Sequence, residues 1–366
     1  MRLVGESDVD DIAVGAAVLG TGGGGSPYLG KLLAQQAIRK HGPVKVVDAS
    51  EVDDSALVIC CAMMGAPTVV AEKLPRGDEL IKAFTTLERY LGRTATHTVS
   101  IEAGGMNSTT PLGVATQLNI PLVDADAMGR AFPELQMVTP TLYGIRASPM
   151  VLADEKGNTV LISAVDNYWT ERLARSITVD MGATASIALY ALSGVQVKET
   201  LVRGTIGLAQ ELGRVLRDTR AAHGDPVTAI VDRLQGRLLF AGKVVDVARR
   251  TEAGFAKGSA RVEGFDADTG AFLELQFQNE YLVAVREGHV VVSVPDLIIT
   301  LDLDSGRPIT TDEIRYGFRV AVVGAPCDSR WRTTAGLELV GPRYFGYDID
   351  YTPLESLGMG TAGGGT

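Results

Sequence analysis

Apolar and polar residues follow a helical period at the start of the chain. Residues 7–19 begin with a serine and acidic side chains and continue with apolar residues at helical spacing. This pattern predicts a helix with negative charge at its positive end. The glycine-rich run 20–27 follows, in which Ser26 and Pro27 are residue types that begin helices. We therefore expect a helix, a glycine loop and a second helix that ends near Arg39.

Short apolar runs then alternate with helical patterns. Residues 56–63 are apolar throughout, as expected for a strand that is covered on both faces. Strands that alternate with helices imply a parallel sheet with right-handed crossovers. The predicted strands are 44–47, 56–63, 96–101 and 120–123, with a hairpin over 150–163; the predicted helices are 78–91, 110–117, 171–181, 183–192 and 204–220.

From about residue 234 the pattern changes to short β-rich runs separated by turn signals. Many short strands at this spacing are typical of a small barrel or sandwich. The chain of 366 residues is long enough for about two domains of roughly 150 residues each. We therefore predict one domain over residues 1–232, a β-rich domain over 233–355 and a glycine-rich tail over 356–366.

Composition and charge argue against several classes of protein. The 34 Lys and Arg against 44 Asp and Glu give a net charge of −10, which repels nucleic acid and anionic lipid. No apolar stretch reaches the ~18 residues that a membrane span needs. The N-terminus has acidic residues where a signal peptide needs basic ones. We expect a cytoplasmic protein that binds a small molecule and neither nucleic acid nor membrane, and a homo-oligomer is plausible.

The three cysteines favour neither a disulfide framework nor a zinc site. Cys60 and Cys61 are adjacent in a predicted strand, so their side chains point to opposite faces and cannot both bind one zinc ion. Buried cysteines usually act as small apolar residues, which makes a nucleophilic role the less favoured alternative. The four histidines form no metal-binding pair.

The glycine run allows more than one interpretation. Gly20, Gly22 and Gly25 fit the GxGxxG pattern, but dinucleotide binding needs a preceding strand and here we expect a helix. We therefore expect no nucleotide cofactor, and a nucleotide-dependent enzyme is a third-ranked alternative. The backbone N–H groups of residues 22–25 can bind an anion or a polar carbonyl group. Alternatively, the glycines only allow a tight corner between two helices.

Candidate site residues follow the ends of two predicted strands. Met64 and Gly65 come directly after the strand over 56–63, at the position where ligands bind in open α/β sheets. Glu102 follows the strand over 96–101 and precedes a glycine turn and Asn107. An acid, free N–H groups and an amide can bind and polarise a small amide-like substrate. The alternative is an ordinary strand–helix turn that Asn107 caps.

A second acidic cluster follows the strand over 120–123. Asp124 and Asp126 share one face of a strand, and Arg130 and Glu134 come soon after them. The cluster could hold a hard cation or carry out acid–base chemistry, so a divalent metal is possible and the cofactor is otherwise unknown. It could equally form an ion-pair network.

Two segments of the β-rich domain also stand out. Residues 278–280 are three polar residues between predicted strands, and they form either a turn or a rim that faces the other domain. Residues 341–348 are rich in aromatic and charged residues. They either pack as a C-terminal plug, which we favour, or supply Arg343 to a substrate carboxylate.

Five motifs in this order resemble one known family over roughly residues 5–355. They are LGTGGGGSPYLG, MGAP, EAGGMNS, VDADAMGRAFPE and GPRYFGYD. Together they are similar to the S-methyl thiohydantoin desulfurase-like family, whose members often accompany hydantoinase-type proteins. The resemblance implies an N-terminal three-layer α/β domain, with a mostly parallel sheet from the strand pattern, and a C-terminal β-barrel-like domain. For the characterised type it implies hydrolytic removal of sulfur from an S-methyl thiohydantoin ring.

The motif positions supply the candidate site residues, to which we assign roles on physical grounds. Glu102 or Asp126 acts as the general base for a water molecule, and Asn107 orients the ring. The N–H groups of the glycine loop bind developing negative charge. The remaining positions are candidates for substrate binding: Gly22, Gly23, Gly24, Gly25, Met64, Gly65, Gly104, Gly105, Asp124, Arg130 and Glu134.

We therefore expect a hydrolase of a small cyclic amide or a thiohydantoin-like ring. The alternative is a non-catalytic binding or regulatory partner of a hydantoinase system, which would use the same pocket without a competent base. Mutation of the acids separates the two, because it would weaken binding but change no rate in the second case.

Overall fold

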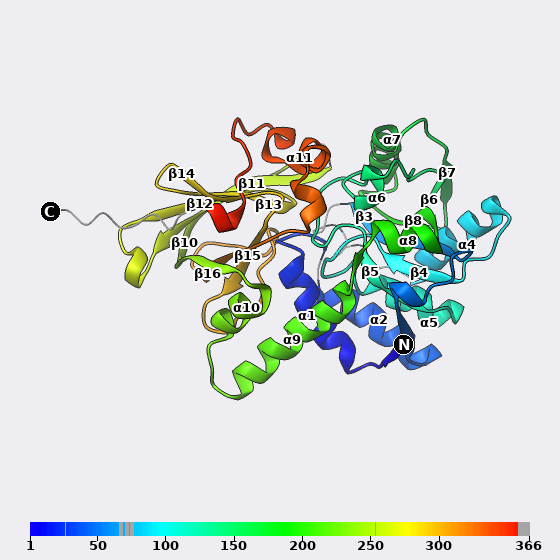
Figure 1. Cartoon of the computed structure of the whole chain (residues 1–366), viewed down its shortest axis with the longest axis horizontal. Coiled ribbons are helices and arrows are strands. Elements are labelled where there is room, and N and C mark those ends of the chain that lie inside the picture. Colours follow the sequence, from blue (N-terminus) through cyan, green and yellow to red (C-terminus); the bar gives the residue numbers. More distant parts are fainter. Residues whose placement is uncertain (26, 66–68, 70–72, 74–76, 253, 358–366) are drawn as a thin grey trace.

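The computed structural model describes residues 1–25, 27–65, 69, 73, 77–252 and 254–357, which form two bodies side by side, each built on one sheet (Figure 1). Ser26, a predicted helix cap, and residues 358–366 of the predicted tail lie outside the described residues. The helix–glycine–helix start of the chain is confirmed. Its helices are α1 (Asp8–Leu19) and α2 (Pro27–His41).

The first sheet has the order β1-β2-β5-β4-β3-β8-β6-β7, and β9 pairs with β5. Strands β2, β5, β4 and β3 are parallel, as the alternation of strands and helices predicts. The other strands join antiparallel, so the sheet is mixed and the prediction of a mostly parallel sheet is wrong. The strands are β1 (Arg2–Val4), β2 (Val44–Asp48), β3 (Leu57–Gly65), β4 (His97–Ser100), β5 (Leu122–Asp126), β6 (Met150–Ala153), β7 (Thr159–Ile162), β8 (Thr184–Ser193) and β9 (Val202–Arg203).

Strand β8 accounts for part of this difference. We predicted a helix over residues 183–192. The alanines of this segment do favour a helix when neighbouring segments are ignored. The segment instead pairs antiparallel with β3 on one side and with β6 on the other. Residues 184–190 are all buried, so burial between two strands and two helical layers outweighs the local preference.

Helices cover both faces of the first sheet. Cys61 packs with Phe84 of α4 (Glu79–Leu91) and with residues of α5 (Thr110–Leu118). Cys60 packs on the other face, in the cluster that contains Ala174 of α7 (Asn167–Asp180) and Val197 of α8 (Gly194–Thr200). The predicted opposite orientation of the two cysteines is therefore confirmed.

The second sheet is antiparallel throughout, with the order β14-β13-β12-β11-β10-β16-β15. Its edge strands, β14 and β15, are not paired with each other in the part of the chain that the structure describes. The sheet is therefore a curled half-barrel, and the prediction of a barrel-like domain needs this correction. The strands are β10 (Arg237–Glu252), β11 (Phe255–Gly264), β12 (Phe272–Gln278), β13 (Glu280–Arg286), β14 (His289–Ser293), β15 (Leu297–Asp302) and β16 (Arg319–Ala325).

Helices α1 and α9 (Thr205–Ala221) cross beside the junction of the two bodies (Figure 1). Their apolar residues share one core with β15 and β16. A Cβ atom on Gly15 would lie 1.8 Å from the carbonyl oxygen of Ala209, so the crossing depends on a missing side chain. The described residues also form the α-helices α6 (Thr139–Leu142), α10 (Pro226–Leu234) and α11 (Thr334–Val340). Among these described residues, no helix has the length and apolar character to cross a membrane.

We predict that Gly15→Ala destabilises the chain by about 1–3 kcal/mol, because the backbone of α9 cannot move away without losing its packing. Gly113→Ala in α5 is the matched control, since its Cβ would lie 3.8 Å from the Cβ of Ala37. That change removes a glycine from a helix interior and should stabilise by roughly 0.5–1 kcal/mol. Denaturant unfolding of both variants measures the difference, and equal stabilities would contradict this account of the crossing.

Candidate active site

A small pocket opens between the first sheet and the second body. Its floor includes the end of β3 and the residues that follow β4, so it lies at the carboxyl ends of parallel strands. The turn between β12 and β13 closes it from the other body through Asn279 and Glu280. Apolar side chains form much of the wall: Met63, Met64, Ile101, Met106, Met128, Phe132, Leu135 and Ile187.

Glu102 lies buried at the floor of this pocket, where Asn107 holds it. The Asn107 side-chain amide donates to Oε1 of Glu102 over 2.6 Å and to the carbonyl of Met63 over 3.2 Å. Its own oxygen accepts from the backbone N–H of Met63 over 2.8 Å. Burial raises the pKa of Glu102, and the Asn107 hydrogen bond opposes that rise. Asn107 therefore fixes the position of Glu102 relative to β3.

Glu280, the first residue of β13, supplies a second buried carboxyl group to the same pocket. Its Oε2 atom has no hydrogen-bond partner among the described residues. Burial raises the pKa of Glu280 well above its ordinary value, the nearby charge of Glu102 raises it further, and Arg130 acts in the opposite direction. The pocket thus contains two acids whose charged forms disfavour each other.

The glycine tract, residues 22–25 between α1 and α2, leaves room for the Glu280 side chain. A Cβ on Gly23 would lie 1.8 Å from Oε1 of Glu280, and a Cβ on Gly22 would lie 2.6 Å from the ring of Tyr281. A Cβ on Gly24 would lie 2.4 Å from the Cα of Gly104. Gly24 and Gly25 also line the pocket. The tract therefore combines the two predicted alternatives, a tight corner and a pocket wall.

Arg130 is buried one layer behind the pocket and joins the two bodies. Its Nη1 donates to the carbonyls of Pro295 and Asp296 over 2.9 and 2.7 Å. Its Nη2 donates to Oγ1 of Thr21 over 2.8 Å and to the carbonyl of Tyr281 over 3.2 Å. One guanidinium group thus contacts both Thr21, directly before the glycine tract, and Tyr281, directly after Glu280.

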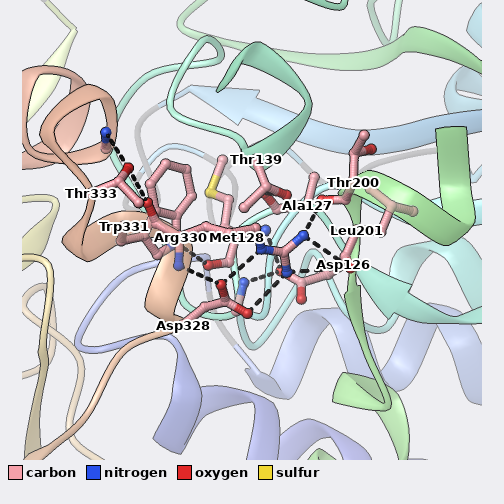
Figure 2. A network of polar contacts seen from close by, with 12 residues as sticks. Asp126, Ala127, Met128, Thr139, Thr200, Leu201, Asp328, Arg330, Trp331 and Thr333 are labelled. Atoms are coloured by element: carbon pink, nitrogen blue, oxygen red, sulfur yellow. Dashed lines mark hydrogen bonds and ion pairs between the residues drawn. The ribbon is translucent and has the colours of Figure 1, made fainter. Parts of the chain in front are cut away.

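Asp126 lies outside the pocket lining and has local structural partners. Its Oδ2 accepts from the N–H groups of Met128 and Gly129 over 2.9 and 2.8 Å. Figure 2 shows that the Met128 carbonyl then accepts from the indole N–H of Trp331, over 2.7 Å. Beside Trp331, Arg330 pairs with Asp328 over 2.8 Å (Figure 2). Asp126 thus fixes the loop that contains Met128, and the C-terminal segment around Trp331 packs onto this loop.

Asp124 is also remote from the pocket. Its Oδ1 accepts from the N–H of Gly207 over 3.0 Å, and its Oδ2 pairs with Arg2 over 3.5 Å. Asp124 therefore links β5 to α9 and β1. The predicted acidic cluster does not assemble at one place, and across the described ranges no group of three or more His, Cys, Asp or Glu side chains could hold a metal ion.

Two further charged residues stand at the pocket wall, Glu134 and Arg175. Glu134 accepts from the hydroxyl of Tyr344 over 2.7 Å, which brings residues 341–348 to the edge of the site. Arg175 pairs with Glu171 over 2.7 Å. Arg343 is exposed and pairs with Asp348 and Asp350 instead of reaching the pocket.

The structure thus sorts the predicted site residues into three groups. Those that line the pocket are Gly24, Gly25, Met64, Gly65, Glu102, Asn107 and Glu134. Those that support the wall from behind are Gly22, Gly23, Gly104, Gly105 and Arg130. Asp124 and Asp126 lie elsewhere. The site prediction missed Glu280, although the polar run over 278–280 was noted as a rim or a turn.

Family models match nearly the whole chain. The model described as "S-Me-THD-like, N-terminal domain" matches residues 7–164, and "S-Me-THD-like, C-terminal domain" matches residues 165–354. The chain belongs to the S-Me-THD-like family. The resemblance that five motifs indicated is therefore confirmed. The family models divide after residue 164, whereas our own division at 232 follows the change from helices to strands and stays a prediction.

A solved relative has the same fold as this S-Me-THD-like chain. It is the crystal structure of a protein from Chromobacterium violaceum, with 26% sequence identity and a TM-score of 0.80. The alignment covers 97% of this chain and all of the relative. A comparison with curated proteins finds no match. The family is thus shown, while the reaction has to be argued from the pocket.

We predict that Gly23→Ala destabilises this S-Me-THD-like chain by about 1–3 kcal/mol, because the new methyl group would clash with the Glu280 side chain. Gly23 has no positive φ, so alanine is compatible with its backbone. Glu280→Ala removes the clashing atoms, so Gly23→Ala should cost little in that background. A double-mutant cycle of unfolding free energies tests this, and an equal penalty in both backgrounds would contradict it.

A second prediction from this site concerns how the stability of the fold depends on pH, through Asp126. Burial raises its pKa to about 7, against roughly 4 in an unfolded chain. The folded chain therefore binds more protons between these values, and its stability falls as pH rises from about 4 to about 7. Asp126→Asn should remove part of this fall while keeping an acceptor for the loop. Urea midpoints at pH 4.5 and 7.5 measure it, and an unchanged difference between the two midpoints would refute this assignment.

Proposed function

We propose that this chain hydrolyses a small S-methyl thiohydantoin-like or related cyclic amide ring. The observation that carries the proposal is the pair of buried carboxyl groups, Glu102 and Glu280, in one largely apolar pocket of an S-Me-THD-like chain. Acid–base hydrolysis needs such groups with pKa values near the working pH. The apolar walls suit a small ring with few charges.

Glu102 is the general base in this proposal. It lines the pocket, Asn107 holds it by a 2.6 Å hydrogen bond, and its raised pKa makes the carboxylate a better proton acceptor than an exposed acid. Asn107 is then a positioning residue, because its amide already contacts Glu102 and Met63. Asp126, the other predicted base, is less favoured since its contacts lie outside the pocket.

The proposed reaction replaces sulfur by oxygen at one ring carbon. Water attacks the carbon that bears the S-methyl group while the Glu102 carboxylate removes a proton. The C–S bond then breaks, the sulfur leaves as methanethiol, and the ring keeps a carbonyl oxygen. One water molecule is consumed and one thiol is released per turnover.

We expect thiol release from S-methyl thiohydantoin in a panel that also contains hydantoin and 2-thiohydantoin, each with and without a side-chain acid. Ring absorbance and a thiol reagent follow turnover, and a chelator arm reports a metal requirement. Glu102→Gln should lower kcat by about 10²–10⁴. Asp126→Asn should change it less than tenfold if the pocket geometry identifies the base.

The same experiment separates the alternative function. A chain that binds a panel member, seen as a rise in Tm, yet turns none over would favour a non-catalytic partner of a hydantoinase system. A larger loss in Asp126→Asn than in Glu102→Gln would reverse our assignment of the base. The predicted cytoplasmic location and homo-oligomer remain predictions.

A further inference from the structure

We propose that Glu280, supplied by the second body, is the protonated acid partner of Glu102 and donates a proton to the ring nitrogen. This inference rests on the proposed function and deepens it. It assigns the chemistry to a pair of residues that only docking of the two bodies brings together. The acids among the predicted site residues all come from motifs of the first body: Glu102, Asp124, Asp126 and Glu134.

The first argument is the difference in hydrogen bonding between the two acids. Glu102 is bound by Asn107 over 2.6 Å, so one of its oxygens is occupied and its orientation is fixed. Glu280 is equally buried, yet its Oε2 lacks a partner within the described part of the chain. A buried polar atom without a partner is costly. A substrate atom that accepts the Glu280 proton would remove that cost.

The second argument is the charge around Glu280. Glu102 lies close enough to disfavour its carboxylate, and Arg130 is the cation that favours it. Arg130 directs hydrogen bonds at the carbonyl of Tyr281 and at Thr21, and Glu280 has no ion pair among the residues described. Arg175, at the wall, is paired with Glu171. The remaining charged groups nearby, Glu134 at the wall and Asp126 behind Glu102, are also acids.

These surroundings favour one proton for the two carboxyl groups. Two neighbouring acids in a buried site do not both ionise, because each charge disfavours the other. Burial raises the pKa of Glu280 well above its ordinary value although Arg130 and backbone N–H groups oppose the rise, whereas the pKa of Glu102, which accepts the Asn107 side-chain hydrogen bond, rises only to about 7. Glu280 is therefore the acid that keeps the proton, and Glu102 is the base.

The proton movements balance over a complete turnover. In the first step, the water oxygen bonds to the ring carbon, its proton passes to Glu102, and the Glu280 proton passes to the ring nitrogen, which takes the C=N electron pair. In the second step, the new hydroxyl returns its proton to Glu280 as the C=O bond forms. The C–S pair stays on sulfur, which takes the proton from Glu102. Both acids end in their starting states.

The position of Glu280 depends on residues that touch no substrate. The N–H of Tyr281 donates to the carbonyl of Thr21 over 2.8 Å, and Arg130 contacts both residues. Gly23 leaves the space that the Glu280 carboxyl group occupies. Arg130 and Gly23 are therefore positioning residues for the acid.

The decisive variant is Glu280→Gln, which keeps the shape of the side chain but cannot serve as the acid. We expect kcat on the S-methyl ring to fall by about 10²–10⁴. The pH–rate profile of the unchanged chain should be bell-shaped, and the variant should lose its basic limb, while Glu102→Gln should lose the acidic limb. Glu274→Gln, an exposed acid on the neighbouring strand β12, is the matched control and should keep the full profile.

Glu280→Asp tests whether Glu280→Gln loses rate only through a folding defect, because it restores a carboxyl group at a shifted position. It should recover part of the rate and the basic limb. Full turnover with an intact basic limb in Glu280→Gln would overturn the proposal, as would a Glu280→Asp variant no better than Glu280→Gln while both unfold like the unchanged chain.

A readout without substrate separates this inference from the proposed function. A protonated buried carboxyl group gives an infrared carbonyl band distinct from that of carboxylates. The comparison is made in the Asp126→Asn background, because Asp126, with a pKa of about 7, would add a band of its own at pH 7. In that background the band should be present, Glu280→Gln should lose it and Glu274→Gln should keep it. Its persistence after Glu280→Gln would overturn the assignment of the proton. A silent panel together with the expected band would reject the proposed substrate class and support the protonated acid.

Discussion

The buried guanidinium of Arg130 is the interaction on which the arrangement of the two bodies depends. A charge away from water is costly unless its hydrogen-bonding groups are satisfied. Arginine presents five donors in a fixed plane, and here they reach carbonyl groups of three chain segments and the Thr21 hydroxyl. The group can be satisfied only when both bodies are in place. The geometry of the pocket follows from that requirement.

The glycine tract is the complement of this charged contact. Arg130 holds Tyr281 of β13 beside Thr21, which follows α1, and the absence of side chains at Gly22 and Gly23 lets Glu280 and Tyr281 come that close. The two features act on the same few residues. The glycine tract therefore allows close packing between the two bodies and also lines the pocket.

The sequence predicted those parts of the structure that local patterns control. The parallel strands, the opposite faces of Cys60 and Cys61 and the helix before the glycine tract follow from periodicity and residue type. Strand β8 did not, because its alanines favour a helix until two neighbouring strands bury it. Glu280 was missed as an acid of the site for a similar reason. Its role depends on a contact between segments far apart in the chain, which no local spacing reveals.

Strand β8 also has a consequence for how the chain can be divided. It belongs to the segment matched by the C-terminal family model, yet it lies inside the first sheet, between β3 and β6. A chain cut after residue 164 would keep both neighbours and lose the strand that joins them. The long apolar edge of β3 would then be unpaired, and such edges recruit strands from other molecules. The segment matched by the C-terminal family model thus covers the edge of β3 and protects the first sheet from aggregation.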